Sequence, residues 1–197
     1  MNADSRTLAV YDAKASEYAA RFGSDRPDRH LQSFIDALPK GACVLDLGCG
    51  PGDAAAFMRA AGLAPDPVDG SAEMVRLANA HHAIRARLAT FDEIDGVAIY
   101  DGIWANFSLL HAARGDVPGH LASLHRAMRP VGLFHIGMKT GTGEARDTLD
   151  RFYTYYSRDE LLGLLGDAGF TVTSIEEGAE RGLAGTLDPW IVMRAHA

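Results

Sequence analysis

A short apolar run that ends in a glycine-rich turn constrains this chain more than any other feature. Residues 42–47 are apolar except for Asp46, and residues 48–52 read Gly-Cys-Gly-Pro-Gly. The apolar run predicts a buried strand, and the amphipathic segment 53–61 predicts a helix directly after it. Glycine has no Cβ, so the backbone of the turn can approach a ligand closely, and the first amides of the helix face the same place. The sequence therefore predicts a ligand-binding turn between a strand and a helix.

The rest of the chain repeats this alternation of apolar runs and amphipathic segments from about residue 28 onward. Further strands are expected at residues 63–69, 84–89, 99–105, 131–138, 171–175 and 190–194, with helices at 31–38, 121–128, after Ser71 and after Ser157. Such alternation predicts an α/β fold, a three-layer sandwich whose mostly parallel seven-stranded sheet has its last strand antiparallel. Pro65 and Pro67 predict partial pairing or a short second strand. We expect a long loop between the last two strands.

Helical spacing also recurs ahead of this repeating unit, at Leu8, Tyr11, Ala15, Tyr18 and Phe22. It predicts an N-terminal helix within residues 1–25 that serves either as a lid or as a packing helix. A length of 197 residues suits one domain. We therefore expect residues 1–197 to form a single domain.

Composition disfavours several partner classes. The 19 basic and 26 acidic residues give a net charge of −7, and no cluster of five Lys or Arg offers a footprint for nucleic acid. The chain has no apolar run of about eighteen residues and no export signal, so we expect no membrane span and a cytoplasmic monomer or homodimer. The placement of Cys43 and Cys49 disfavours a disulfide, and the scattered His and Cys residues predict no metal site.

Polar residues gather where the predicted strands end, which is where open α/β sheets bind ligands. Asp46 lies in an apolar strand, where a carboxylate is costly unless amides or a cation, such as a ligand ammonium group, satisfy it. Asp69 ends the second strand seventeen residues after Gly52. This is close to the spacing of roughly twenty at which an acidic residue accepts hydrogen bonds from a ribose diol. A nucleoside ligand is therefore implied.

Two further strand ends give weaker signals. Phe91 and Asp92 follow the third strand, where an aromatic ring could cover an adenine and a carboxylate could accept from the adenine amine. Asn106 and Phe107 follow the fourth strand, with His111 nearby. These residues would border a transferable group.

The glycine spacing separates two classes of nucleotide cofactor. It is Gly-x-Gly-x-Gly, and Asp53 stands where a nicotinamide-dependent enzyme would complete Gly-x-Gly-x-x-Gly. The segment 44–52, Val-Leu-Asp-Leu-Gly-Cys-Gly-Pro-Gly, resembles the first motif of the class I S-adenosylmethionine-dependent methyltransferases at essentially every position. Residues 68–74 resemble the second motif, and residues 101–105 with 109–111 resemble the fourth. The likeness runs from about residue 8 to 175; Val131 departs from it, because the family usually has two glycines after the proline at 130.

The resemblance implies a Rossmann-like fold and S-adenosylmethionine as the cofactor. The glycine turn would hold the methionine portion, Asp69 the ribose hydroxyls, and Phe91 with Asp92 the adenine. The tyrosines of the N-terminal helix would close over the cofactor or simply pack in the core. The residues expected to contact the cofactor are Tyr11, Tyr18, Asp46, Gly48, Cys49, Gly50, Gly52, Asp69, Gly70, Met74, Thr90, Phe91, Asp92, Asn106 and Phe107.

The expected reaction is methyl transfer to a small-molecule acceptor by in-line displacement, which depends mainly on alignment of the reacting atoms. His111 is the candidate base, because its ordinary pKa of about 6.5 suits proton transfer. Packing or capping at a helix start explains His111 equally well. Two other functions stay open: a non-catalytic S-adenosylmethionine-binding module, and an NAD-dependent oxidoreductase, which the glycine spacing disfavours.

The acceptor is expected to bind to the segment 138–156. The basic residues Lys139, Arg146 and Arg151 could receive a carboxylate or a phosphate, whereas the tyrosines at 153, 155 and 156 could stack on a planar acceptor. A solvated loop anchored by aromatic residues explains the same pattern. The residues expected to contact the acceptor are Lys139, Arg146, Tyr153 and Tyr156.

Overall fold

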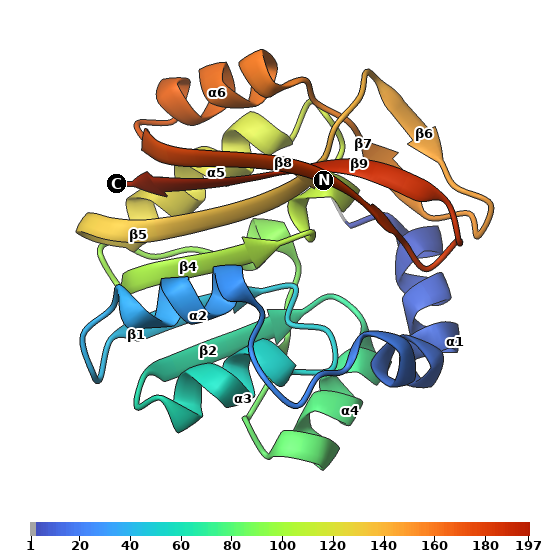
Figure 1. Cartoon of the computed structure of the whole chain (residues 1–197), viewed down its shortest axis with the longest axis horizontal. Coiled ribbons are helices and arrows are strands. Elements are labelled where there is room, and N and C mark those ends of the chain that lie inside the picture. Colours follow the sequence, from blue (N-terminus) through green and yellow to red (C-terminus); the bar gives the residue numbers. More distant parts are fainter. Residues whose placement is uncertain (1–2) are drawn as a thin grey trace.

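The chain folds into a seven-stranded sheet with helices on both faces (Figure 1). The computed structural model describes residues 3–197. The strand order is β3-β2-β1-β4-β5-β9-β8; β9 runs antiparallel to both of its neighbours, and the other neighbouring pairs are parallel. The bounds are Cys43–Leu47 (β1), Ala64–Asp69 (β2), Arg87–Leu88 (β3), Tyr100–Asn106 (β4), Met128–Lys139 (β5), Thr171–Arg181 (β8) and Leu187–His196 (β9). The predicted fold class, including the antiparallel last strand, is confirmed.

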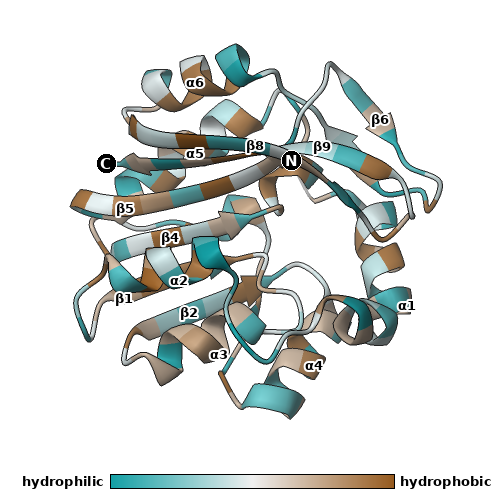
Figure 2. Cartoon of the chain, viewed as in Figure 1, coloured by the Kyte–Doolittle hydropathy of each residue, from teal (hydrophilic) through white to brown (hydrophobic). Residues whose placement is uncertain are grey.

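The helices form two layers because successive residues of each central strand point to opposite faces. Val44 packs with α2 (Arg29–Asp36) and α3 (Asp53–Ala60), whereas the neighbouring Leu45 packs with α5 (Val117–Ala127) and α6 (Arg158–Asp167). Hydrophilic residues colour outer parts of α4 (Ala72–His82) and α6, as expected for amphipathic helices (Figure 2). α1 (Ser5–Phe22) stands beside the end of the sheet toward which β4 points, and it packs on α4 (Figure 1).

The two prolines of β2 are accommodated on one side of the strand. β2 pairs with β1 from Ala64 to Val68, but it pairs with β3 only at Val68 and Asp69. Pairing is thus partial, as expected, and it is lost on the β3 side.

β3 is shorter than the predicted strand at 84–89. The side chain of Asn79 takes both backbone groups of Ala86, donating to its carbonyl at 2.9 Å and accepting from its amide at 2.7 Å. Arg85 also has a left-handed backbone, with φ of 60°. Because a side chain satisfies the backbone there, only Arg87 and Leu88 remain in the sheet.

The connection from α5 to β5 contains no loop, although the sequence predicts a helix end at Arg129-Pro130. The helix ends at Ala127 and the strand begins at Met128, so Pro130 lies inside β5. Val131 adopts φ of 59°, a left-handed conformation that glycine accepts more readily. The departure from the family pattern at Val131 is therefore also a site of backbone strain.

The prediction of a long loop between the last two strands is wrong. β8 and β9 form a long hairpin that is paired from Thr171–His196 to Arg181–Leu187, and only residues 182–186 connect them. The added part of the hairpin carries Glu, Gly, Ala and Arg, so its sequence lacks the alternating apolar residues that mark a buried strand. This polar tip reaches past the core toward α1 (Figure 1).

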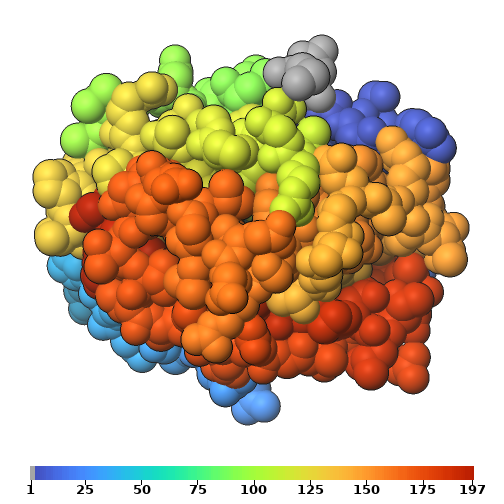
Figure 3. All heavy atoms as spheres, turned by 90° about the horizontal axis from the view of Figure 1, so that it is seen from above, coloured from blue at the N-terminus to red at the C-terminus, as the bar shows by residue number. Residues whose placement is uncertain are grey.

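A second small hairpin lies in the segment expected to be a loop. β6 (Glu144–Arg146) pairs antiparallel with β7 (Phe152–Thr154), and it lies beside α1 in the space-filling view (Figure 3). Arg6 of α1 pairs with Asp150 in this hairpin, and the amide of Phe152 donates to Thr7 Oγ1 at 2.8 Å. The other end of α1 is tied to the β8–β9 tip, where Arg21 donates to the carbonyls of Gly182 and Leu183.

Among the helices within residues 3–197, none combines the length and the apolar character that crossing a membrane requires.

Candidate functional site

Two cavities meet where β1, β2 and β4 end. The first has a volume of about 100 Å³ and the second about 370 Å³. α1, the glycine turn and the segment after β4 contribute to both, and the residues shared by the two cavities are Tyr11, Tyr18, Gly48, Gly50, Asn106, Phe107 and His111. The two cavities therefore form one continuous site with a waist between α1 and the strand ends.

The glycine turn shapes the waist. Gly48 and Gly50 have positive φ values of 76° and 53°, and a Cβ on Gly48 would collide with Ser108. The amides of Gly48 and Cys49 both donate to the carbonyl of Val68, which fixes the turn against β2. Cys49 lines the second cavity. The turn thus presents backbone rather than side chain to a ligand.

Gly52 has a different role from the one expected. It lines neither cavity, and a Cβ there would lie 2.6 Å from Ile84 Cδ1 and 3.0 Å from Ala78 Cβ. Its φ of 94° starts α3 close to α4. The glycine thus allows close packing between α3 and α4, and its expected contact with a cofactor stays a prediction.

Asp46 is a buried carboxylate beside the second cavity. Its residue is 2% exposed, and its Oδ2 atom has no hydrogen-bond partner within residues 3–197. Burial raises the pKa of Asp46 to about 7, and the negative charge of Asp69 acts in the same direction. A buried carboxylate oxygen without a partner is costly unless a ligand supplies one. The position fits the ammonium group of an amino acid.

Asp69 faces the first cavity together with Gly70 and Met74. Its Oδ2 accepts from the amide of Gly50 and its Oδ1 from the amide of Ser71, both at 2.8 Å. Burial raises the pKa of this carboxyl, while the two amides hold its charge in place. An ionised carboxylate accepts up to about four hydrogen bonds, so Asp69 retains acceptor positions for a pair of hydroxyls.

Only some of the residues predicted to contact the adenine line the first cavity. Thr90 and Phe91 line the first cavity, but Asp92 does not. Asp92 sits in the short 3-10 turn η1 (Phe91–Glu93), is exposed, and accepts a hydrogen bond from Thr90 Oγ1 at 2.7 Å. Asp92 therefore lies outside the lining of the first cavity, and its contact with an adenine amine stays a prediction. The first cavity also contains apolar and small residues that no motif marks: Leu8, Ala89 and Ser108.

His111, in the 3-10 turn η2 (Leu109–His111), stands at the waist with both ring nitrogens engaged. We assign the proton to Nδ1, which donates to the carbonyl of Phe152 at 2.6 Å, so that Nε2 accepts from the Tyr11 hydroxyl at 2.8 Å. Arg151 in turn donates to the Tyr11 oxygen at 3.1 Å. Burial lowers the pKa of His111 to about 4, and the nearby charge of Arg151 adds to this effect. The imidazole is therefore neutral near pH 7, with its lone pair facing Tyr11.

Asn106 is held by the strand next to it. Its Oδ1 accepts from His135 Nε2 at 3.0 Å, and a Cβ on Gly137 would lie 2.7 Å from the same oxygen. His135 is fully buried and stacks on Trp104 with ring centroids 3.6 Å apart. The next residue, Phe107, has φ of 57°, and strained residues of this kind cluster at functional sites. With its oxygen held by His135, the amide of Asn106 can offer its NH₂ group to both cavities.

Two of the four expected acceptor residues line the second cavity. Lys139 and Tyr153 do so, and the Lys139 ammonium lies 4.0 Å from the centre of the Tyr153 ring. Arg146 is instead paired with Asp4 at 2.6 Å and borders a third cavity. Tyr156 is buried in the core and donates to the carbonyl of Arg114 at 3.3 Å. Arg146 and Tyr156 therefore hold the β6–β7 region in place and lie outside the second cavity.

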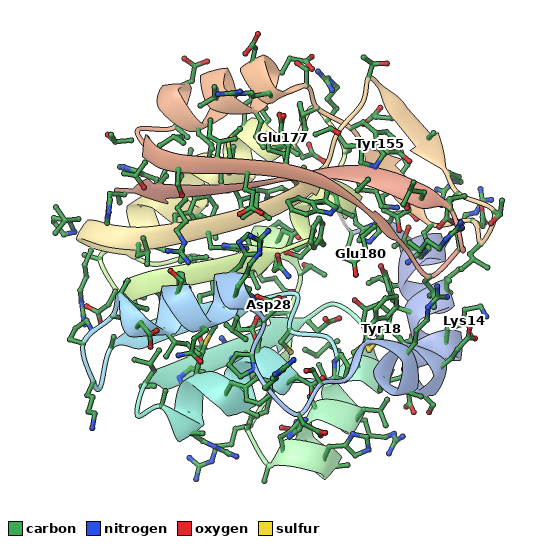
Figure 4. The ribbon with its side chains drawn as sticks, viewed as in Figure 1. Lys14, Tyr18, Asp28, Tyr155, Glu177 and Glu180 are labelled. Carbon is green, nitrogen blue, oxygen red and sulfur yellow. The ribbon has the colours of Figure 1, made fainter. Side chains whose placement is uncertain are left out.

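The tip of the β8–β9 hairpin was missed as part of the site. Figure 4 shows Glu180 of β8, Tyr18 of α1 and Asp28 at the start of α2 around the same opening. The residues of the second cavity that no motif marks include Phe22, Asp28, Glu180, Arg181, Leu183, Asp188 and Trp190. The sequence carried no signal for this tip, and its packing is visible only in the structure, where Gly178 lies opposite Trp190 and a Cβ on it would collide with the indole ring.

Metal-binding clusters of three or more His, Cys, Asp or Glu do not occur within residues 3–197, and Cys43 and Cys49 are both free thiols.

Comparisons with known proteins agree with this geometry. A family model described as a methyltransferase domain matches residues 17–175. The chain is 36% identical over 128 residues to malonyl-[acyl-carrier protein] O-methyltransferase of Pseudescherichia vulneris, a match that covers 63% of this chain and 49% of the relative. It is 30% identical over 139 residues to a ubiquinone/menaquinone biosynthesis C-methyltransferase of Rubrivivax gelatinosus, covering 66% and 55%. The chain thus spans about half the length of these curated relatives.

Among solved structures, the chain resembles the 1,6-didemethyltoxoflavin N1-methyltransferase of Burkholderia thailandensis, crystallised with its acceptor and S-adenosylhomocysteine. The TM-score is 0.77 at 26% identity, over 97% of this chain and 87% of that one. The strand order, the glycine turn and the family match lead to the same assignment. The chain belongs to the class I S-adenosylmethionine-dependent methyltransferases, in the family defined by this methyltransferase domain.

Proposed function

We propose that this chain transfers a methyl group from S-adenosylmethionine to a small-molecule acceptor by in-line displacement. The observation that carries the proposal is the partnerless Oδ2 of Asp46 beside the turn of Gly48 and Gly50, because a buried carboxylate there suits an amino-acid ammonium group. The adjoining first cavity offers the Asp69 carboxylate for a ribose diol and Phe91 for an adenine face.

When bound, S-adenosylmethionine supplies a sulfonium methyl group that passes to a lone pair of the acceptor while the electron pair of the broken S–C bond stays on sulfur. The residues of the chain align the partners, and alignment of this kind supplies roughly 7–11 kcal/mol. Tyr11 and Tyr18 of α1 line both cavities and exclude water from the waist. α1 is thus proposed as a lid.

His111 has a limited role in moving a proton. Its low pKa makes it a weak base, and its lone pair is taken by the Tyr11 hydroxyl. An acceptor that replaces this hydroxyl at Nε2 could pass its proton to His111. Acceptors that lose no proton, such as tertiary amines, need no such step, so we assign His111 first to holding the waist.

The acceptor is proposed to be a small molecule rather than nucleic acid. The second cavity has a volume of about 370 Å³, and the chain carries a net charge of −7. The proteins named above are O-, C- and N-methyltransferases, so membership in the family does not identify the atom of the acceptor that is methylated.

A non-catalytic S-adenosylmethionine-binding module is the alternative. Such a module would keep the glycine turn but close the acceptor side. The open second cavity, which meets the first at Tyr11 and His111, favours an enzyme.

The proposal is tested by incubating the chain with S-adenosylmethionine carrying a deuterated methyl group and a panel of metabolites, read by mass spectrometry. We expect a labelled product from at least one acceptor, and no product from a Gly48→Ala variant. If the chain binds S-adenosylhomocysteine but gives no labelled product with any O-, N- or C-acceptor, the proposal of an enzyme is rejected in favour of the non-catalytic binding module.

A further inference from the structure

The second cavity is rich in aromatic rings. They come from four elements, α1, β4, β7 and β9, and from the segment after β4: Tyr11, Tyr18, Phe22, Trp104, Phe107, Tyr153 and Trp190. Trp190 lies across the backbone of Gly178, so its indole is supported from behind by β8. Aromatic walls of this kind favour flat ligands, because stacked and edge-on contacts add to the burial of apolar surface.

The cations of this cavity are already engaged by partners from the chain. Lys139 pairs with Asp188 at 2.6 Å, and Arg151 pairs with Asp147 at 2.7 Å while being only 3% exposed at its side chain. Arg181 donates its guanidinium to the carbonyl of Gly185 in the hairpin turn. An anionic acceptor would have to displace a carboxylate or break this turn contact, so the sequence-based expectation of a carboxylate or phosphate subsite loses its basis.

Unpartnered polar groups remain on the same side of the site. The side chain of Glu180 has no hydrogen-bond or ion-pair partner among the described residues. The hairpin register places Glu180 opposite Asp188, and Asp188 is the residue that pairs with Lys139. The Tyr153 residue is 2% exposed, yet its hydroxyl has no partner within residues 3–197. Burial raises the pKa of Tyr153, so this hydroxyl stays protonated and is a donor. The cavity thus offers one unpaired hydroxyl donor and one free acidic acceptor.

The remaining acidic groups are committed. Asp28 accepts from the amides of His30 and Leu31 at the start of α2, and Asp53 contacts His82 at 3.0 Å. Asp46 faces the expected ammonium position. Glu180 is therefore the acidic side chain of the cavity that is left for the acceptor.

We propose that the methyl acceptor is an uncharged, planar aromatic or heteroaromatic molecule that lies against Trp190, with a polar edge that accepts from the Tyr153 hydroxyl and donates to Glu180. Acceptors bearing a carboxylate or a phosphate are disfavoured. This inference rests on the proposed function, because it assigns the side of the second cavity lined by Trp190, Tyr153 and Glu180 to the acceptor and leaves Asp46 to the cofactor. It names the substrate class of that cavity.

The test uses calorimetry on the full chain at pH 7.5, first titrated to saturation with S-adenosylhomocysteine. Two matched pairs of probes follow: 4-hydroxyquinoline with its 2-carboxylate, and 2-naphthol with 3-hydroxy-2-naphthoate. We expect the uncharged member of each pair to bind at least about tenfold more tightly. Tighter or equal binding of the carboxylates overturns the inference, and so does failure of both uncharged rings to bind.

Two variants locate the polar contact. Glu180→Gln should weaken 4-hydroxyquinoline several-fold and reduce the discrimination against its carboxylate. The matched control is Glu177→Gln, because Glu177 is an exposed residue of the same strand, lies outside the cavity, and sits away from the opening in Figure 4. Equal effects of the two substitutions would contradict a role for Glu180.

A third variant tests the aromatic platform. Trp190→Leu should weaken both uncharged rings about fivefold to tenfold while leaving the S-adenosylhomocysteine titration unchanged; unchanged ring binding would remove Trp190 from the subsite. The first titration separates the two proposals: absence of S-adenosylhomocysteine binding breaks the proposed function. Normal binding followed by preference for the carboxylates breaks only the inference about the acceptor.

Discussion

The two cavities of the site are lined by different kinds of groups. The first has backbone and short side chains from the ends of β1 and β2 as its polar walls, and its key carboxylate, Asp69, is held by amides close along the chain. The second is walled by long side chains from α1, the β6–β7 hairpin and the β8–β9 tip, and buried ion pairs such as Arg151–Asp147 hold them. The cofactor side therefore depends on local backbone geometry, whereas the acceptor side depends on contacts between segments far apart in sequence.

The largest expected effect concerns the ion pair that organises the acceptor side. Arg151→Met leaves Asp147 without its cation in a pair whose side chains are 3% and 11% exposed, and it also removes the donor to Tyr11. Breaking a buried pair from one side costs about 3–5 kcal/mol. We expect the free energy of unfolding, measured by urea denaturation, to fall by about that amount.

The control for this pair is Arg6→Met. Arg6 pairs with Asp150 in the same hairpin region, but both side chains are largely exposed. Exposed pairs contribute less than about 1 kcal/mol. Similar losses in the two variants would contradict the view that burial makes Arg151 structural.

The next effect is a direct test of the backbone on the cofactor side. Gly48→Ala introduces a Cβ that collides with Ser108 at a residue with φ of 76°. Gly41→Ala has the same left-handed strain, with φ of 81°, and no neighbour within 4 Å of its Cβ. We expect calorimetry with S-adenosylhomocysteine to show about a hundredfold loss for Gly48→Ala and normal affinity for Gly41→Ala. Retained binding by Gly48→Ala would mean that the turn does not hold the ligand.

The pH dependence of cofactor binding sharpens the comparison further. Without ligand, Asp46 has a pKa of about 7, so it is mostly protonated at pH 6, and a ligand ammonium must displace that proton. Affinity for S-adenosylhomocysteine should therefore fall about tenfold between pH 8 and pH 6. In Asp46→Asn this slope should vanish and binding at pH 8 should weaken at least about tenfold.

Asp101→Asn is the control for Asp46. Asp101 is also a strand carboxylate, but it pairs with Arg129 and accepts from the amide of Cys43 outside both cavities. It should keep the pH slope of the unmodified chain. Without ligand, the free energy of unfolding changes with pH in the direction opposite to the affinity. The unfolded chain ionises Asp46 near its usual pKa, whereas the folded chain ionises it only near pH 7. This group therefore lowers the free energy of unfolding as the pH rises between those values.

The smallest expected effect lies at the waist. Tyr11→Phe removes the hydroxyl that donates to the neutral form of His111, so the pKa of His111 should rise from about 4 while burial still keeps it below its usual value. Turnover should fall less than about tenfold. Histidine NMR titration measures the shift, and an unchanged pKa would contradict the assigned tautomer.

The cofactor side could be predicted from sequence because its geometry is local. Asp46, Gly48 and Gly50 follow one another along the chain, and Asp69 ends the next strand, so spacing alone brought them together. The mostly parallel seven-stranded sheet and its antiparallel last strand were also predicted, whereas the strand order is known only from the structure. Gly52 shows the limit, since a glycine in the motif serves helix packing against Ile84 instead.

The acceptor side could be predicted only in outline. Lys139 and Tyr153 lie in the expected segment, but Arg146 faces Asp4, a partner 142 residues away that no pattern relates to it. The polar sequence of β8 near Glu180 gave no strand signal, because the tip extends past the core and needs no apolar face. The tertiary fold decides that the tip of the β8–β9 hairpin lines the second cavity, which is why Glu180 and Trp190 were missed.

The central claim is that the glycine turn, Asp46 and Asp69 together hold an adenosyl amino acid. The most direct test is calorimetric titration of the full chain with S-adenosylmethionine, S-adenosylhomocysteine and NAD. The geometry predicts one site per chain for both adenosyl compounds and no heat from NAD. Tight binding of NAD with no response to either adenosyl compound would contradict it.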